Sequence, residues 1–235
     1  EFTSDPNFNI DENQTLVGTV EASDQDNDSV TFSVSGSDLA ITSAGILSFI
    51  SAPDYESKSS FSATVTASDG SNTTDQSILV SVNNVNDNSP AFKSSSSFSV
   101  NENQNAIGTV SAIDADGDTV SFSIDNSDIN INASTGVMTF VSMPDYETQS
   151  SYVATISASD GENSIEQDIS ISIIDLNEFA PVFGNTSFEV SEQEIEIGNI
   201  NVSDADGDNL SLTLSGGDAN AFVINSAFRT INFIL

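Results

Sequence analysis

The sequence predicts an all-β protein built from tandem seven-stranded β-sandwich repeats, and three observations lead to this class. Short stretches alternate apolar and polar residues, as in residues 119–124, which is the pattern of half-buried strands. Helical periodicity is not evident along the chain. Turn residues such as those of 133–136 interrupt these stretches often enough for about seven strands in each ~90 residues.

The sequence also repeats itself, with a period of 90 to 91 residues. The segment FNIDENQ at Phe8 returns as FSVNENQ at Phe98, so Glu12 corresponds to Glu102, and the PDYE and SDG motifs return in the same order. The same spacing leads from Glu102 to Glu192. We therefore expect two whole repeats and part of a third. Their expected bounds are residues 1–90, residues 91–181 and residues 182–235.

The third repeat is expected to be truncated. Its last residues, INSAFRTINFIL, align with INASTGVMTFVS of the second repeat, before the positions of the last two strands. Half a sandwich leaves strand edges uncovered, which predicts partial disorder, strand exchange between molecules or a cleavage product. Arg229 replaces Gly45 and Gly136 at a turn, so this hairpin is expected to differ. Phe92 and Phe183 are expected to close the cores of their repeats.

Composition narrows the classes of function. The chain has 235 residues, of which 37% are apolar, and this is enough to form cores. It has 36 Asp and Glu but only 3 Lys and Arg, a formal net charge of -33, which excludes nucleic acid as a partner. There is no Cys or His, which excludes thiolate zinc sites and Ser-His-Asp catalysis. No stretch reaches the ~18 apolar residues of a membrane span, and the start shows no signal peptide, as expected of an excised soluble segment.

The strand order brings acidic motifs of neighbouring repeats together. In the second repeat we expect seven strands. The first ends near Val100, and the others cover residues 108–113, 119–124, 129–131, 137–141, 152–158 and 165–174. If these strands alternate in direction, Glu102, PDYE and the following linker lie at one end, and DADGD and SDG lie at the other. Because the last strand leads directly into the next repeat, each acidic end faces the acidic end of its neighbour.

Two clusters of seven carboxylates are therefore predicted. The first consists of Glu12, Asp54, Glu56, Asp87, Asp114, Asp116 and Asp160, and the second of Glu102, Asp145, Glu147, Asp175, Glu178, Asp204 and Asp206. Two carboxylates ~4 Å apart near a protein surface repel by about 4 kcal/mol, so each cluster requires cations. Ca²⁺ takes about 6 to 8 oxygen ligands in flexible geometry and suits such a set better than Mg²⁺. Two or three Ca²⁺ per linker are expected.

These motifs resemble those of the cadherin repeat family, in the same order and over nearly the whole chain. The matching motifs are the Glu of NEN, PDYE, the linker NVNDNSP, the DAD pair and the Asp of SDG. The resemblance implies a Greek-key, Ig-like sandwich with up to three calcium ions per linker. By position, it assigns Glu12, Asp54, Glu56 and Asp87 to the lower ions and Asn86, Asp114, Asp116 and Asp160 to the upper ion. Asn88 and Asn177 complete the linker ligand set that the resemblance implies.

The chain also departs from the family pattern. Asn84 stands where an Asp is usual, and Glu178 and Phe179 stand where Asp and Asn are usual, so occupancy in either linker is expected to fall to two ions. With no Trp, the strand-swap adhesion of vertebrate cadherins is not expected. The richness in Asn, Asp and Ser is similar to that of cadherin-like repeats of large bacterial surface proteins. We therefore expect an extracellular or cell-surface location on a bacterium, as part of a membrane-associated parent protein.

Other interpretations of the acidic residues are weaker. Asp24, Asp26 and Asp69 lie at the upper end of the first repeat and are expected to form half a site. DADGD is not an EF-hand loop, because its sixth position is Thr119 and its twelfth is Asp125. No nucleophile, base or cofactor motif is identifiable, so an enzyme is not predicted. The expected function is cell adhesion or a calcium-rigidified spacer, with other such repeats as homophilic partners. The alternative is a module of a larger secreted protein that binds cell-surface polysaccharide or another partner.

Overall fold

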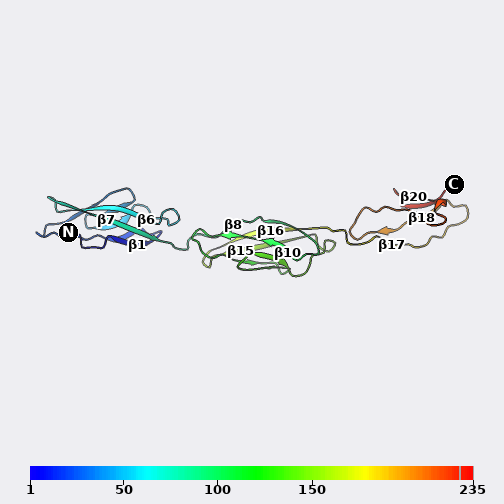
Figure 1. Ribbon diagram of the computed structural model, residues 1–235, viewed down its shortest axis with the longest axis horizontal. Coiled ribbons are helices and arrows are strands. Elements are labelled where there is room, and N and C mark those ends of the chain that lie inside the picture. Colours follow the sequence, from blue (N-terminus) through cyan, green and yellow to red (C-terminus); the bar gives the residue numbers. More distant parts are fainter. Residues whose placement is uncertain (228, 235) are drawn as a thin grey trace. The chain divides into compact units, whose positions relative to one another are not determined.

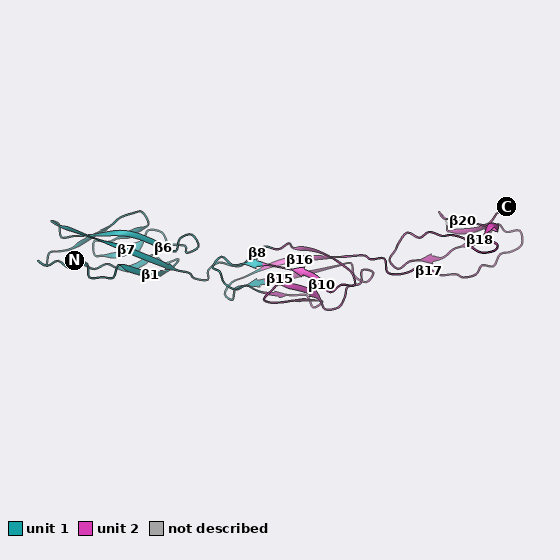
Figure 2. Cartoon of the chain, in the orientation of Figure 1, with its two compact units in different colours: residues 1–93, 112–121, 158–165 teal, residues 94–111, 122–157, 166–235 magenta. Residues whose placement is uncertain are grey.

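The computed structural model describes residues 1–227 and 229–234, and nearly all of their regular structure is β-strand (Figure 1). The only regular helix among these residues is η1 (Ala219–Ala221), and no described helix is long and apolar enough to cross a membrane. The all-β prediction is therefore confirmed. The chain divides into two compact units (Figure 2). The first comprises residues 1–93, 112–121 and 158–165, and the second comprises residues 94–111, 122–157 and 166–235.

The first unit contains the whole first sequence repeat together with two loops of the second. Its strands are β1 (Asn7–Asp11), β2 (Leu16–Thr19), β3 (Thr31–Val34), β4 (Leu39–Ile41), β5 (Ile46–Phe49), β6 (Ser60–Ser68), β7 (Thr73–Asn83), β8 (Ala91–Phe92) and β11 (Ala112–Ile113). They form a four-stranded sheet β1-β7-β6-β3, a three-stranded sheet β2-β5-β4 and the pair β11-β8. β1 pairs parallel with β7, whereas the neighbouring strands pair antiparallel.

The two larger sheets of this unit enclose an apolar core because their strands alternate. In β6, Val65 and Ala67 are buried while the intervening Ser and Thr residues face outward. Leu47 of β5 and Val80 of β7 are fully buried in the same core. Burial of one such side chain contributes about 1.5–3 kcal/mol, so the alternation itself specifies which face of each strand is inside.

The second unit repeats this arrangement. Its strands are β9 (Ser97–Asn101), β10 (Ala106–Thr109), β12 (Ser121–Ile124), β13 (Ile129–Ile131), β14 (Val137–Phe140), β15 (Ser151–Ser159), β16 (Ser164–Ile174), β17 (Val182–Phe183), β18 (Glu196–Asn199), β19 (Val202–Ser203), β20 (Phe222–Asn225) and β21 (Thr230–Phe233). Sheets β12-β15-β16-β9 and β10-β14-β13 correspond to the two sheets of the first repeat. The third repeat contributes the pair β17-β19 and the sheet β18-β21-β20. The predicted boundaries at 90 and 181 stay a prediction.

Two local expectations need correction. The predicted strand 108–113 is two strands, because β10 pairs with β14 and β11 pairs with β8, so the chain changes partner between them. Phe183 does not close a core, since its side chain is 55% exposed. Arg229 itself keeps two features of the glycines that it replaces. It adopts a left-handed φ of 51°, and its carbonyl accepts the Ile200 N–H at 2.7 Å, as the glycine carbonyls accept Val20 and Val110. Residue 228 of this turn lies outside the described residues, so the expected difference of the hairpin stays a prediction.

Candidate metal centres

A buried glutamate follows the first strand of each full repeat. The side chain of Glu12 is 3% exposed, and its carboxylate accepts the backbone N–H groups of Tyr55 at 2.8 Å and Val85 at 2.9 Å. Glu102 is fully buried and accepts the equivalent N–H groups of its own loop and linker at 2.8 and 2.7 Å. A buried carboxylate is costly unless its oxygens are satisfied, so these bonds fix the PDYE loop and the linker beside the glutamate.

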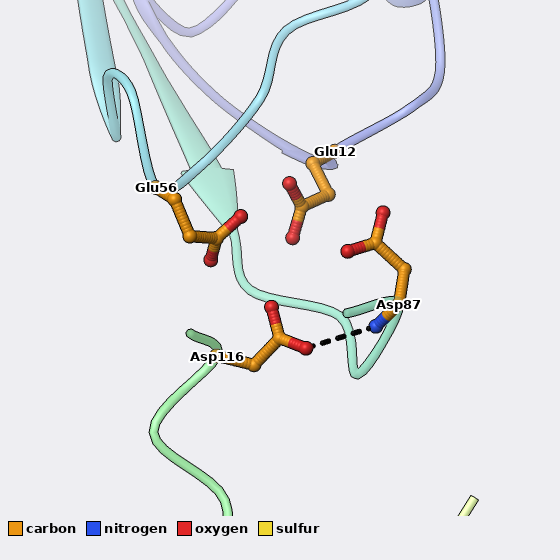
Figure 3. A group of neighbouring side chains, drawn as sticks. All are labelled: Glu12, Glu56, Asp87 and Asp116. Carbon is orange, nitrogen blue, oxygen red and sulfur yellow. Dashed lines mark hydrogen bonds between the residues drawn. The ribbon is translucent and has the colours of Figure 1, made fainter. Parts of the chain in front are cut away.

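The first acidic cluster is made by Glu12, Glu56, Asp87 and Asp116. Each of these side chains offers an oxygen that lies within 4.8 Å of the other three. Figure 3 shows the four carboxylates directed toward a common centre. Glu12 and Glu56 come from the first repeat, Asp87 from the linker, and Asp116 from a loop of the second repeat. All four lie in the first unit, so the sequence-predicted meeting of two acidic ends is present within one compact body.

Amide groups support this cluster. The Asn88 side-chain amide donates to Asp116 Oδ1 at 2.8 Å and to Asp87 Oδ1 at 2.9 Å. The backbone N–H groups of Asp87 and Asn88 donate to Asp116 Oδ2 at 3.1 and 2.9 Å. Burial opposes ionisation of Asp116, but these hydrogen bonds outweigh it and lower its pKa. Asn84 donates to the Asp116 carbonyl at 2.7 Å. Asp116 is therefore held ionised and aimed into the cluster.

Asp116 also belongs to a second group, with Asp114 and Asp118. Asp160 lies in the same unit but outside the carboxylate groups found among the described residues, and its Oδ1 accepts the N–H groups of Glu162 and Asn163 at 2.8 and 2.6 Å. Burial raises the pKa of Asp160, but these bonds outweigh it and lower the pKa. Asp114 Oδ2 and Asp160 Oδ2 are buried oxygens that have no hydrogen-bond partner in the structure. Such oxygens fit a cation, because a buried polar atom otherwise has a partner.

The second acidic cluster lies in the second unit. Glu102, Asp145 and Glu147 form one group of carboxylates, and Glu147, Asp175 and Asp206 form the next. Asp204, Asp206 and Asp208 form a third, in which Asp206 has the place of Asp116. Asp206 Oδ2 accepts two linker N–H groups, at 3.0 and 2.8 Å, and its Oδ1 is buried without a hydrogen-bond partner.

Burial and neighbouring negative charges shift the pKa values of the second cluster. Burial and the neighbouring charges of Glu102 and Asp175 raise the pKa of Glu147. Burial and the charges of Asp206 and Glu102 raise the pKa of Asp175, and burial and Glu102 raise the pKa of Glu178. In the first cluster, burial and the charge of Glu12 raise the pKa of Glu56. Each cluster therefore holds more negative charge than its protein surroundings neutralise.

Some predicted residues lie outside these groups. Asp54 is bound to its own turn, where its carboxylate accepts the Ser57 N–H at 3.2 Å and the Ser57 hydroxyl at 3.0 Å. Within the described residues, Asp24, Asp26 and Asp69 do not form a carboxylate group of the kind found in the linkers. Asp24 instead accepts the N–H of Asp26 at 2.8 Å. Asp114 accepts the N–H of Asp116 in the same way, so the predicted half-site stays a prediction.

The linker asparagines have different surroundings. Asn86 Oδ1 accepts a hydrogen bond from the Asn163 side chain at 2.8 Å, and the Asn177 amide donates to Asp208. Sequence reasoning missed Asn163, Asp118 and Asp208. The signal for Asp118 and Asp208 is the aspartate at every second position of DADGD, and Asn163 repeats Asn72 three residues after the SDG aspartate. Whether each of these residues is a metal ligand stays a prediction.

The chain was compared with known proteins. No family model matches it. It is 32% identical over 186 residues to mouse Protocadherin Fat 4, covering 71% of this chain but only 4% of that protein. It is 28% identical to Chitinase A of Pseudoalteromonas piscicida, over 84% of this chain and 24% of that protein. The human CDH23 EC21-23 structure covers 100% of this chain, and the chain covers 90% of that structure, with a TM-score of 0.80 and 19% identity.

The fold and the acidic groups define a tandem β-sandwich protein with carboxylate-rich linkers. The chain belongs to the cadherin repeat family, as the motif order predicts. The structural likeness supports the predicted Ig-like sandwich. Because the chain spans a few per cent of the protocadherin, the activities and partners of that protein do not transfer directly.

Proposed function

We propose that this chain is an extracellular calcium-binding module, whose linkers bind two to three Ca²⁺ each and become rigid when they do. The observation that carries this proposal is the first acidic cluster, in which carboxylates from two repeats and their linker converge within 4.8 Å. Four like charges at this separation repel strongly, and a bound divalent cation converts that repulsion into attraction between the repeats.

Calcium fits this set of donors for two reasons. The chain has no Cys or His, so the side chains of both clusters offer oxygen donors only, which favours a hard cation. The donors are carboxylates and amides on loops, and their irregular arrangement suits the flexible coordination of Ca²⁺ better than the near-octahedral geometry of Mg²⁺. In the first linker, Glu12, Glu56 and Asp87 would hold the lower ions, and Asp114, Asp116 and Asp160 the upper one.

The test is thermal unfolding and amide exchange in chelator, in 2 mM Mg²⁺ and in 2 mM Ca²⁺. A site with a Kd of about 0.1 mM stabilises the folded state by about 2 kcal/mol at 2 mM calcium, which raises Tm by on the order of 10 °C. Magnesium should give a much smaller shift. Identical melting and exchange in chelator and calcium would overturn the proposal.

A matched set of variants assigns the effect to the linkers. Glu56→Gln and Glu147→Gln each remove a carboxylate from one cluster, whereas Glu166→Gln removes an exposed carboxylate of β16 outside both clusters. The first two should each weaken calcium binding, and the third should leave it unchanged. Equal affinities in all three variants would show that the bound calcium is elsewhere.

Rigid linkers support a role in cell adhesion or as a spacer at the cell surface. Protocadherin Fat 4 shares this type of repeat, which favours such a role. Homophilic association with other repeats of this kind is the partner we propose. Sedimentation in calcium tests it directly, because a concentration-dependent dimer that disappears in chelator is the expected result. A bacterial source remains a prediction from composition.

A second candidate is a repeat module of a larger secreted enzyme that contacts polysaccharide. The likeness to Chitinase A favours it, because the matched region covers 24% of that protein. Tyr55 and Tyr146 are each 36% exposed and are equivalent in the two repeats, so they offer two aromatic surfaces. A pull-down on chitin with and without calcium tests this candidate. Retention that Tyr55→Ala and Tyr146→Ala abolish is the expected result.

A further inference from the structure

An asparagine with a left-handed backbone follows the buried glutamate of each full repeat. Asn13 has a φ of 63°, and the equivalent Asn103 has a φ of 61°. The N–H of Asn13 donates to the Pro53 carbonyl at 3.0 Å, and the N–H of Asn103 donates to the Pro144 carbonyl at 2.9 Å. Asparagine adopts a positive φ more readily than most residues other than glycine. The backbone therefore fixes each asparagine beside the PDYE loop of its own repeat.

Each of these asparagines binds a carboxylate of the linker that follows its repeat. The side-chain amide of Asn13 donates to Asp87 Oδ2, and that of Asn103 donates to Glu178 Oε2. Asp87 and Glu178 are equivalent positions of the two linkers. Both partners of each bond lie in one compact unit. The same bond forms in both repeats, although one carboxylate belongs to an aspartate and the other to the longer glutamate.

These amides occupy carboxylate oxygens that a metal ion would need. Asp87 is one of the four carboxylates of the first acidic cluster. Its Oδ1 accepts the Asn88 amide at 2.9 Å and its Oδ2 accepts the Asn13 amide, so each oxygen already has a donor. An amide N–H carries partial positive charge, and a calcium ion on the same oxygen would repel it. An ion that binds both oxygens of Asp87 must therefore displace the Asn13 amide.

The second linker shows the consequence for a longer side chain. Glu178 is bound by Asn103, and it lies outside the groups of converging carboxylates among the described residues. Asp87, with its shorter side chain, stays within its group while Asn13 binds it. Release from the asparagine would free the Glu178 carboxylate to join the second cluster.

We propose that Asn13 and Asn103 compete with calcium for the linker carboxylates and so lower the calcium affinity of the two linkers. This inference rests on the proposed function, because it concerns the ions that the clusters are proposed to bind. Without the ion, each amide holds its linker carboxylate and keeps the linker ordered. With the ion, the amide releases the carboxylate, and the loss of this hydrogen bond opposes binding. The two asparagines thereby set the calcium concentration at which each linker becomes rigid.

The experiment replaces each asparagine by glycine, which keeps the left-handed backbone and removes the amide. In chelator, amide exchange of residues 84–88 should accelerate by about 3- to 10-fold in Asn13→Gly, because this linker loses a hydrogen bond. The calcium concentration that protects residues 84–88 half-maximally should fall by about 3- to 10-fold in the same variant, because no amide then has to be displaced. Asn103→Gly should have both effects on residues 175–179.

Asn27→Gly is the matched control. Asn27 also has a left-handed φ, of 65°, but its N–H donates to the Asp24 carbonyl at 3.4 Å in a turn outside both linkers. Its replacement should change neither the exchange of the linkers nor their calcium affinity.

Faster exchange in chelator combined with tighter calcium binding distinguishes competition from a purely structural role, in which a loosened linker binds calcium more weakly. Equal or weaker calcium binding by Asn13→Gly and Asn103→Gly would overturn this inference and leave the proposed function standing. An unsubstituted chain that binds no calcium would overturn both.

Discussion

The two acidic clusters come from equivalent motifs, but their carboxylates differ in number and in the amide groups that bind them. In the first, the Asn88 amide lies between Asp87 and Asp116 and donates to both, whereas Phe179 stands at the equivalent position of the second. The first linker begins with the neutral Asn84, and the second with Asp175. Burial and neighbouring charges raise the pKa of Glu56 in the first cluster, and those of Glu147, Asp175 and Glu178 in the second.

This difference indicates how each linker behaves without an ion. Amide donors in the first cluster stabilise its ionised carboxylates by charge-assisted hydrogen bonds. The second cluster has fewer such donors and one more linker carboxylate, so its repulsion is relieved mainly by cations. We expect the second linker to depend more strongly on calcium than the first.

The largest expected effect is weaker calcium binding in one linker when a single aspartate of that linker's cluster is replaced. Asp116 belongs to both groups of the first cluster, and Asp206 belongs to two groups of the second. Asp116→Ala should weaken calcium binding in the first linker on the order of 10²-fold, because it removes charge from two ion positions. Asp206→Ala should do the same in the second. Calorimetric titration of both variants measures the affinity and the number of ions lost.

Hydrogen exchange of residues 84–88 and 175–179 provides the control for this prediction. Each variant should increase exchange in its own linker in calcium and leave the other linker unchanged. If either substitution loosened both linkers equally, the two clusters would not be independent sites.

A smaller effect is expected from exchanging the residues that distinguish the clusters. Phe179→Asn places an amide among the carboxylates of the second linker, and Asn88→Phe removes it from the first. In chelator, amide exchange of residues 175–179 should slow by about 3- to 10-fold in the first variant, which corresponds to one hydrogen bond of about 0.5–1.5 kcal/mol. Exchange of residues 84–88 should accelerate similarly in the second. Unchanged exchange in both would mean that the amide is not the source of the difference.

Much of the fold could be predicted because each short alternating pattern, weak by itself, occurs again at the same position of the next repeat. The predicted strand at 129–131 coincides with β13, and those at 137–141 and 165–174 differ from β14 and β16 by one residue. The change of partner between β10 and β11 was not predictable, because Val110 continues the alternation through it. The left-handed φ of Arg229 was not predictable either, because such a backbone conformation is uncommon outside glycine.

The candidate site was predictable in outline but not in detail. Motif order and strand direction bring Glu12, Glu56, Asp87 and Asp116 together, as the structure shows. Spacing alone could not separate Asp54 from Asp145. Both carboxylates accept the N–H and the hydroxyl of the residue three positions further on, yet only Asp145 belongs to a group of converging carboxylates. Such a distinction depends on side-chain rotamers and on small differences in loop position, which a single sequence does not specify.

The smallest expected effect is a difference in the pH dependence of the metal-free linkers. Glu147, Asp175 and Glu178 have pKa values raised above their usual range, chiefly by burial and then by neighbouring charges. The folded state therefore holds their protons more tightly than the unfolded state, and their contribution to stability is lost as the pH rises through the raised values. Acidification from pH 7 toward 5 in chelator should thus slow exchange of residues 175–179, after correction for its intrinsic pH dependence.

The first linker should respond less, because its groups oppose one another. Hydrogen bonds outweigh burial and lower the pKa values of Asp116 and Asp160, so their stabilisation is present above the unfolded pKa and is lost as the pH falls through the folded one. Glu56, with a raised pKa, changes in the opposite sense. Exchange of residues 84–88 should therefore change less than that of 175–179 over the same range. An equal response of the two linkers would mean that the different hydrogen bonds from amide groups do not control the pKa values of their carboxylates.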